Sequence, residues 1–170
     1  MIIAPDKFRD EELLEPKEVL EKAGVEVRVA CTGLAGARGT LGAQVKPDVL
    51  FTDLRAGDYD AFIFVGGAGA SIYWDDPFAH ALAAGAVEKN KIVAAICIAP
   101  VTLAKAGVLE GKRATVWPSE AEQLTAAGAR YSASPVVKDG NIITGAGPAA
   151  ARKFGEEVLK ALQGPCEEKR

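Results

Sequence analysis

The chain has 170 residues, of which 49% are hydrophobic and 25% are charged, and its 20 Lys and Arg against 23 Asp and Glu give a net charge of −3. These values are typical of a globular domain with its own core. No apolar run approaches the roughly 18 residues of a membrane span, and the first residues show no basic and apolar signal segment. We therefore expect a cytoplasmic protein without membrane contact. The acidic charge balance also disfavours nucleic acid as a partner.

The cysteines and histidines are too few and too scattered for a metal site. Cys31, Cys97 and Cys166 have no metal-ligand spacing, and His80 is the single histidine. An odd number of cysteines without such spacing argues against a disulfide framework and against a zinc site. We expect no metal and no cofactor.

Short apolar runs alternate with helical patterns along the chain, and this alternation predicts an α/β fold with a mostly parallel sheet. The predicted strands span 25–30, 61–65, 91–96, 113–116 and 141–144. The predicted helices span 11–23, 77–89, 99–106, 119–127 and 148–162. The runs 62–65 and 92–96 are apolar at nearly every position, as strands covered on both faces are, so we expect them at the centre of the sheet.

Turn and cap residues refine these boundaries. Asp75 or Asp76 predicts the start of the helix over 77–89, and Ser119 with Glu122 predicts a capping box. Asp139-Gly140 predicts a hairpin turn within 135–143. Residues 32–57 have no strong period and predict a loop or small hairpin at a sheet edge. Only Met1 to Ala4 precede Pro5, which predicts a short first strand and a weak sheet edge there.

Two glycine-rich segments resemble phosphate-binding motifs but lack their context. Gly145-Ala-Gly-Pro-Ala-Ala150 formally matches a dinucleotide fingerprint, yet the chain has no second strand ending in an acidic residue about 20 residues later. Gly66-Gly-Ala-Gly-Ala-Ser71 lacks the lysine of a P-loop. We therefore do not expect a nucleotide site at either segment.

Cys97 lies where a buried strand runs directly into a helix, which is the position of a nucleophile elbow. Backbone N–H groups of the following turn favour a thiolate there, so we expect Cys97 to be the most acidic of the three thiols and reactive at neutral pH. A buried cysteine in an alanine-rich layer is an equally good interpretation of the local sequence. Cys31 at a strand end and Cys166 in the tail carry no such signal.

Four segments in order make the chain similar to the ThiJ/PfpI family. They are Phe8-Arg-Asp-Glu-Glu-Leu-Leu-Glu-Pro16, Phe64-Val-Gly-Gly67, Ala94-Ala-Ile-Cys-Ile-Ala-Pro100 and Asp139-Gly-Asn-Ile-Ile-Thr-Gly145. The resemblance runs from Met1 to about Leu162, and the family includes a Parkinson-associated protein deglycase and archaeal intracellular peptidases. It implies a flavodoxin-like three-layer α/β sandwich of the class I glutamine amidotransferase-like type, as a single domain over 1–163 with a charged tail over 164–170.

The resemblance also implies site residues. The family pairs the elbow cysteine, here Cys97, with a glutamate four residues before a proline, here Glu12. Its oxyanion donors match the backbone amides of Gly67 and Ile98. Without the resemblance, Glu12 would read as an ordinary carboxylate in the first turn of a helix.

The chain departs from the family at the histidines. The peptidases have His directly after the nucleophile, where this chain has Ile98, and other members have His before a Pro, where it has Trp117. A Cys–His dyad cannot be formed at those positions, which disfavours a peptidase or amidase. His80 reads as a surface histidine of the helix over 77–89.

The remaining pocket residues are expected near the Gly-rich loop. Gly66, Tyr73 and Trp74 would line the cleft, although Tyr73 and Trp74 fit a helix start with partly buried aromatics equally well. Trp117 would close the pocket in place of the missing histidine.

The sequence therefore predicts a cysteine-dependent protein acting on small reactive carbonyls in the glyoxalase or deglycase manner of the family. Cys97 would be the nucleophile and Glu12 the acid–base group. The alternative is a non-catalytic protein that responds to oxidative stress through oxidation of Cys97. As in the family, we expect a homodimer or a larger homo-oligomer.

Overall fold

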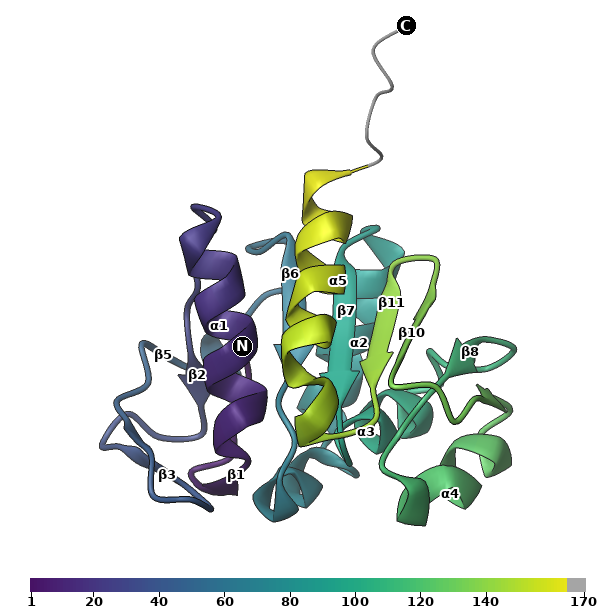
Figure 1. The fold of residues 1–170 in the computed structure, drawn as a ribbon, viewed down its shortest axis with the longest axis horizontal. Coiled ribbons are helices and arrows are strands. Elements are labelled where there is room, and N and C mark those ends of the chain that lie inside the picture. Colours follow the sequence, from purple (N-terminus) through teal and green to yellow (C-terminus); the bar gives the residue numbers. More distant parts are fainter. Residues whose placement is uncertain (165–170) are drawn as a thin grey trace, which may run out of the picture.

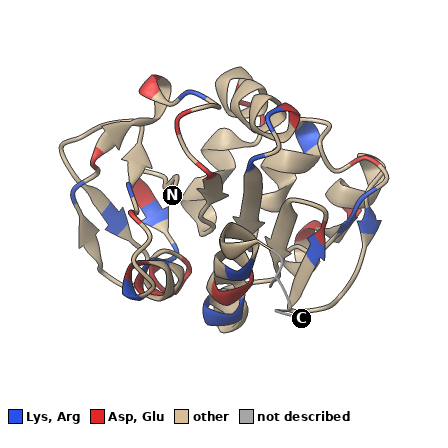
Figure 2. Ribbon diagram, turned by 90° about the horizontal axis from the view of Figure 1, so that it is seen from above, with Lys and Arg blue, Asp and Glu red and all other residues tan. Residues whose placement is uncertain are grey.

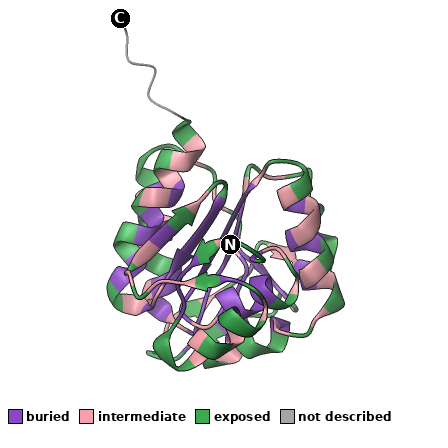
Figure 3. Cartoon of the chain, turned by 90° about the vertical axis from the view of Figure 1, so that its right-hand side faces the viewer, coloured by how far each residue is buried: buried purple, intermediate pink, exposed green. Residues whose placement is uncertain are grey.

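The computed structural model describes residues 1–164 and shows one central sheet between two layers of helices (Figures 1 and 3). Cys166 and the rest of the predicted tail beyond Gly164 lie outside the described residues. Lys and Arg are interspersed with Asp and Glu around the periphery (Figure 2). No helix within 1–164 is long and apolar enough to cross a membrane.

The central sheet has its two apolar strands in the middle, as the sequence predicts. Its hydrogen-bonded order is β10-β11-β7-β6, and Ile2 then bridges Phe64 of β6 to Ala30 of β2, which pairs with β5. All of these pairings are parallel except that of β10 with β11. The strands are β2 (Ala30–Cys31), β5 (Val49–Leu50), β6 (Ala61–Phe64), β7 (Ile92–Ile96), β10 (Val136–Asp139) and β11 (Ile142–Gly145).

The structure corrects two expectations about the strands. The segment around Ile2 does not form a weak edge, because it lies between two strands and Ile2 is only 1% exposed. Of the predicted strand over 25–30 only its last residue lies in β2, and of 113–116 only Arg113–Ala114 forms a strand, β8, which pairs with β9 (Arg130–Tyr131). Short segments at the periphery have few ladder partners, so their β-branched residues overstate the strand length.

A second, smaller sheet lies beside the amino-terminal segment. It contains β1 (Asp6–Phe8), β3 (Ala37–Gly39) and β4 (Gln44–Val45), so the segment over 32–57 does contain a small hairpin. The buried carboxylate of Asp10 accepts hydrogen bonds from the Leu41 and Ala43 amides, both at 2.8 Å. These bonds lower the pKa of Asp10 against the opposing effect of desolvation, and they fix the hairpin turn to the start of the first helix.

Five α-helices cover the two faces of the central sheet. They are α1 (Asp10–Lys22), α2 (Pro77–Glu88), α3 (Pro100–Lys105), α4 (Ala121–Ala126) and α5 (Ala151–Gln163). The 3₁₀ helices within residues 1–164 are η1 (Phe51–Asp53), η2 (Ala68–Tyr73), η3 (Pro118–Glu120) and η4 (Pro148–Ala150). Helices α1 and α5 lie side by side on one face, with α2 behind the sheet (Figure 1).

The helix caps agree with the sequence in one case and differ in another. Asp76 caps α2 by accepting from the Phe78 and Ala79 amides, as predicted. The capping box of Ser119 and Glu122 is wrong, because Pro118 starts a 3₁₀ turn there and α4 begins only at Ala121. Proline fixes its own φ and so favours this earlier start.

The strand β7 divides the core between the two faces. Val93 and Ala95 belong to the cluster that includes α2 and α3, whereas Ile92, Ala94 and Ile96 belong to the cluster that includes α5. Successive side chains of a strand point to opposite faces, so a run of apolar residues serves both helical layers. This fixes the carboxyl end of β7 at the centre of the molecule.

Helices α1 and α5 approach closely where Gly155 meets Pro16. A Cβ atom on Gly155 would lie 2.7 Å from the Cα atom of Pro16, closer than side-chain atoms approach a backbone. The glycine thus allows α5 to pack against the segment of α1 that carries the site residues described below.

We predict that Gly155→Ala lowers the free energy of unfolding by about 1–3 kcal/mol, because the added methyl group overpacks this contact. An alanine in an unconstrained helix would instead raise stability by up to about 1 kcal/mol. Urea denaturation measures the difference. Gly33→Ala is the control, since nothing lies within 4 Å of its Cβ position, and a stabilised Gly155→Ala variant would contradict the close packing.

Candidate functional site

Cys97 occupies a left-handed backbone conformation directly after β7. Its φ is 63°, which is unusual for a residue other than glycine and costs on the order of 1–3 kcal/mol. Two hydrogen bonds hold it there: the Cys97 amide donates to the Gly145 carbonyl at 2.9 Å, and the Trp117 amide donates to the Cys97 carbonyl at 2.8 Å. Cys97 therefore lies at a sharp turn directly after β7, at the position where the sequence predicts the elbow.

The side chain of Glu12 points from the first turn of α1 to the same place. Glu12 is 0% exposed, and neither of its carboxyl oxygens has a hydrogen-bond partner within 1–164. Gly66 lies between the two groups, since a Cβ atom there would be 2.6 Å from Cys97 Cβ and 2.8 Å from Glu12 Oε2. The absence of a side chain at Gly66 is therefore what lets the carboxyl group and the cysteine share one site.

Burial changes the charge state of Glu12. Desolvation raises the pKa of this carboxyl group to about 8, while Cys97 and Arg9 oppose the rise. A carboxyl group without hydrogen bonds from surrounding donors is far more stable when it is neutral. Glu12 is consequently protonated at neutral pH and can donate a hydrogen bond.

The thiol of Cys97 is less acidic than the sequence suggests. Desolvation and the nearby Glu12 carboxyl group raise the pKa of Cys97 to about 12, and the amides of Gly67 and Ile98 act in the opposite direction. The expectation of an acidic thiol at neutral pH is thus not confirmed, because the amides do not offset burial. The two groups titrate as a pair, in which Glu12 loses its proton at a lower pH than Cys97 does.

The amides expected to form an oxyanion site lie on either side of the sulfur. Gly67 has φ of 98°, and a Cβ atom there would be 2.4 Å from the Arg9 nitrogen. The Arg9 amide donates to the Gly66 carbonyl at 2.9 Å, which fixes the glycine loop against the start of α1. Gly67 and Ile98 both lower the pKa of Cys97 through their backbone hydrogens.

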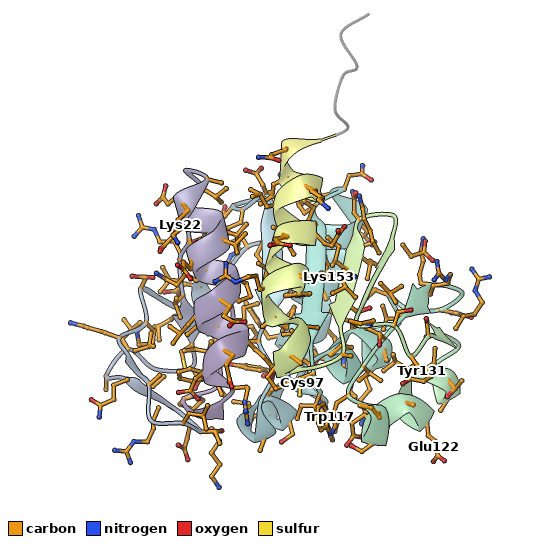
Figure 4. All side chains as sticks on the ribbon, in the orientation of Figure 1. Lys22, Cys97, Trp117, Glu122, Tyr131 and Lys153 are labelled. Carbon is orange, nitrogen blue, oxygen red and sulfur yellow. The ribbon has the colours of Figure 1, made fainter. Side chains whose placement is uncertain are left out.

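The aromatic residues divide between the site and the core. The Trp74 indole N–H donates to the Ile98 carbonyl at 3.1 Å, and Trp117 lies beside Cys97 at the carboxyl end of β7 (Figure 4). Tyr73 is not a cleft residue: it is 2% exposed, packs on Phe51 and hydrogen-bonds the Ile3 carbonyl. Its position in η2 turns it toward the core rather than toward the cysteine.

His80 is held away from the cysteine. Its Nε2 atom lies 2.7 Å from the Trp74 carbonyl oxygen, and the side chain is partly buried. It remains a residue of α2, as the sequence predicts.

Two residues of the site were not singled out in the sequence as such. Gly145 accepts the Cys97 amide, and Gly147 leaves room for the Trp117 ring, since a Cβ atom at 147 would lie 2.8 Å from its Cε3 and Cζ3 atoms. The signal in the sequence is the Gly-x-Gly pattern that starts at the end of β11, which matches a dinucleotide fingerprint only formally. Gly145 instead accepts the hydrogen bond that holds Cys97, and Gly147 leaves space for the Trp117 ring.

A cavity of about 680 Å³ lies away from this site. Its lining includes Val25, Val49, Tyr59 and Ala61, at the amino end of the parallel strands. The site of Cys97 is at the carboxyl end, where open parallel sheets bind ligands.

The fold and the site define a class: α/β sandwiches with a cysteine at a nucleophile elbow and a buried carboxyl group beside it. The sequence profile of the DJ-1/PfpI family matches residues 1–161. The chain belongs to this family.

Individual relatives support this assignment. An uncharacterized protein of Methanocaldococcus jannaschii is 46% identical over 96% of this chain and 81% of its own length. A deglycase of Pyrococcus abyssi is 31% identical over 96% and 98%, and a glutathione-independent glyoxalase of Caenorhabditis elegans is 27% identical over 97% and 88%. The crystal structure of a ThiJ/PfpI domain protein from Brachyspira murdochii has a TM-score of 0.93, at 33% identity over 95% and 94% of the two chains.

We predict that Glu12→Gln becomes progressively more stable than the native chain as the pH rises from about 5 to 8. In this range the folded native chain keeps the Glu12 proton that the unfolded chain has lost, because burial raises its pKa from 4.5 to about 8. The native free energy of unfolding then falls by about 1.4 kcal/mol per pH unit relative to the variant, and the difference levels off above pH 8.

Urea denaturation at several pH values measures this difference. Glu11→Gln is the matched control, since the hydrogen bond from Arg9 lowers the pKa of Glu11 and leaves it charged throughout this range. A pH-independent difference between Glu12→Gln and the native chain would show that Glu12 is already ionised in the folded state.

Proposed function

We propose that this protein is a cofactor-free enzyme that converts small reactive carbonyl compounds, in the glyoxalase or deglycase manner of its named relatives, with Cys97 as nucleophile and Glu12 as acid–base group. The proximity of the buried Glu12 carboxyl group and Cys97 around Gly66 is the observation that carries this proposal. The relatives named as a deglycase and a glyoxalase add support.

In the first step the pair has lost the Glu12 proton, and the Glu12 carboxylate takes the thiol proton of Cys97 while the sulfur adds to the aldehyde carbon of an α-oxoaldehyde. The aldehyde oxygen takes the Glu12 proton, which gives a hemithioacetal and a Glu12 carboxylate. The amides of Gly67 and Ile98 stabilise the negative oxygen while it forms.

The next step moves a proton between adjacent carbons. The Glu12 carboxylate removes the hydrogen of the former aldehyde carbon and returns the proton to the neighbouring carbon, while the hydroxyl proton moves to the second oxygen. The product is a thioester of a 2-hydroxy acid. Water then hydrolyses the thioester, which releases the 2-hydroxy acid and the thiol.

The same geometry disfavours a peptidase. A departing amine needs a proton from a group such as imidazole, and the single histidine of the chain is bonded to the Trp74 carbonyl. Oxidation of Cys97 is the second candidate, because a protonated Glu12 can donate a hydrogen bond to a sulfinate oxygen. Mass spectrometry under peroxide, alongside a turnover assay, separates oxidation from catalysis.

We predict that the purified chain forms lactate from methylglyoxal without added metal or nucleotide. Cys97→Ala should abolish this activity, and Glu12→Gln should reduce kcat by about 10² or more, because positioned acid–base groups contribute that much. Glu11→Gln, one residue away and partly exposed, should retain activity. Lactate formation no faster than in Cys97→Ala would exclude the enzyme and leave the oxidation candidate.

We further predict that Glu12→Gln alkylates faster than the native chain at pH 9 although it has lost turnover. Above pH 8 the native Glu12 is a carboxylate, which raises the pKa of Cys97, and the amide removes this charge. Iodoacetamide rates measured for Cys97 by mass spectrometry test this. Equal slowing of alkylation and turnover would mean that the substitution simply disrupts the cysteine.

A further inference from the structure

The surface next to Cys97 is formed by two tryptophans and an isoleucine. We call these three residues, Trp74, Ile98 and Trp117, the aromatic rim. Trp117 is 44% exposed although it is a large apolar residue, and its ring lies against Gly147 in the loop after β11. Figure 4 shows Trp117 below Cys97 at the same end of the sheet.

Hydrogen bonds to the backbone connect the rim to Cys97 and to the residue after it. The Trp117 amide donates to the carbonyl of Cys97 itself, and the Trp74 indole donates to the carbonyl of the next residue, Ile98. Pro118 follows Trp117 and starts η3, which restricts the backbone there further. The Trp74 ring is held through its own N–H and the Trp117 ring packs against Gly147, so little conformational entropy is lost when a ligand binds.

The rim carries no charge of its own, and two basic residues near it are already paired. Arg9 forms an ion pair with Glu11 at 2.8 Å, and Lys105 forms one with Asp75 at 2.8 Å. An anionic substrate would have to compete with these carboxylates. A flat apolar group would instead gain contact with the exposed indole of Trp117, which stacks well on other rings.

We propose that Trp117 forms a specificity subsite of the Cys97 site, and that the site prefers α-oxoaldehydes carrying a flat apolar group, such as an aryl ring, over those carrying a methyl group. This inference rests on the proposed function for its substrate type. The predicted preference for a flat apolar group rests on the aromatic rim alone.

The ratio of kcat/KM for phenylglyoxal to that for methylglyoxal tests the preference. We expect Trp117→Ala to lower this ratio about tenfold, and Trp117→Phe to keep most of it, because a phenyl ring still offers a stacking face. Leu34→Ala is the control, as Leu34 is a large apolar residue of similar exposure, 42%, in the loop before β3. A ratio unchanged in Trp117→Ala would overturn the proposal.

Alkylation of Cys97 supplies a readout that does not need turnover. We expect N-benzyl iodoacetamide to react faster than iodoacetamide in the native chain, and the preference to fall about tenfold in Trp117→Ala while the iodoacetamide rate stays the same. If the native chain has no turnover but shows this preference, the proposed function fails and the subsite stands. If both reagents lose rate equally in Trp117→Ala, the residue only supports the elbow and the subsite is wrong.

Discussion

The burial of a neutral carboxyl group beside a cysteine is the constraint on which this structure depends. A carboxyl group whose two oxygens have no hydrogen-bond partner within 1–164 and no exposed surface is costly to ionise, so Glu12 holds its proton at neutral pH. The arrangement survives only because Gly66 leaves the space between the two side chains empty. In the proposed mechanism Glu12 is also the group that moves protons, so the contact that lowers the stability of the fold is the one on which the proposal rests.

The rest of the site consists largely of backbone. Cys97 is fixed by a carbonyl of β11 on one side and by the amide of Trp117 on the other. The glycine loop is fixed to α1 through Arg9. Because strands, loop and helix each contribute a main-chain group, side-chain changes at the periphery leave the elbow in place, whereas a side chain at Gly66 or Gly67 collides with it.

The sequence predicts those features of this structure whose causes lie close together along the chain. The runs of β6 and β7 are apolar on both faces and unambiguous, and Asp76 has its amide partners within three residues. The predicted bounds of the short strands were wrong, because pairing with neighbouring strands decides where such a strand begins and ends. In 25–30, for example, only Ala30 lies in a strand. The predicted position of Tyr73 in the cleft was wrong for a related reason, because its hydroxyl group bonds to Ile3, which is 70 residues away.

The site shows the same division. The elbow at Cys97 follows from a strand that meets a helix, and resemblance alone pointed to Glu12, since a first-turn carboxylate has no local mark of burial. The pKa of Cys97 depends on desolvation by the whole fold, which no local pattern contains, and so the expected acidity was not confirmed.

Asp10 and Glu12 lie within one turn of α1, and this makes the β3–β4 hairpin a mechanical part of the site. The Asp10 carboxylate holds the amides of Leu41 and Ala43, while Glu12 faces Cys97 two residues further along the same rigid turn. A displacement of the hairpin therefore also moves Glu12, because Asp10 connects the hairpin to the same helical turn. The exposed turn around Leu41 thus tolerates changes of side chain far more readily than changes in its backbone path.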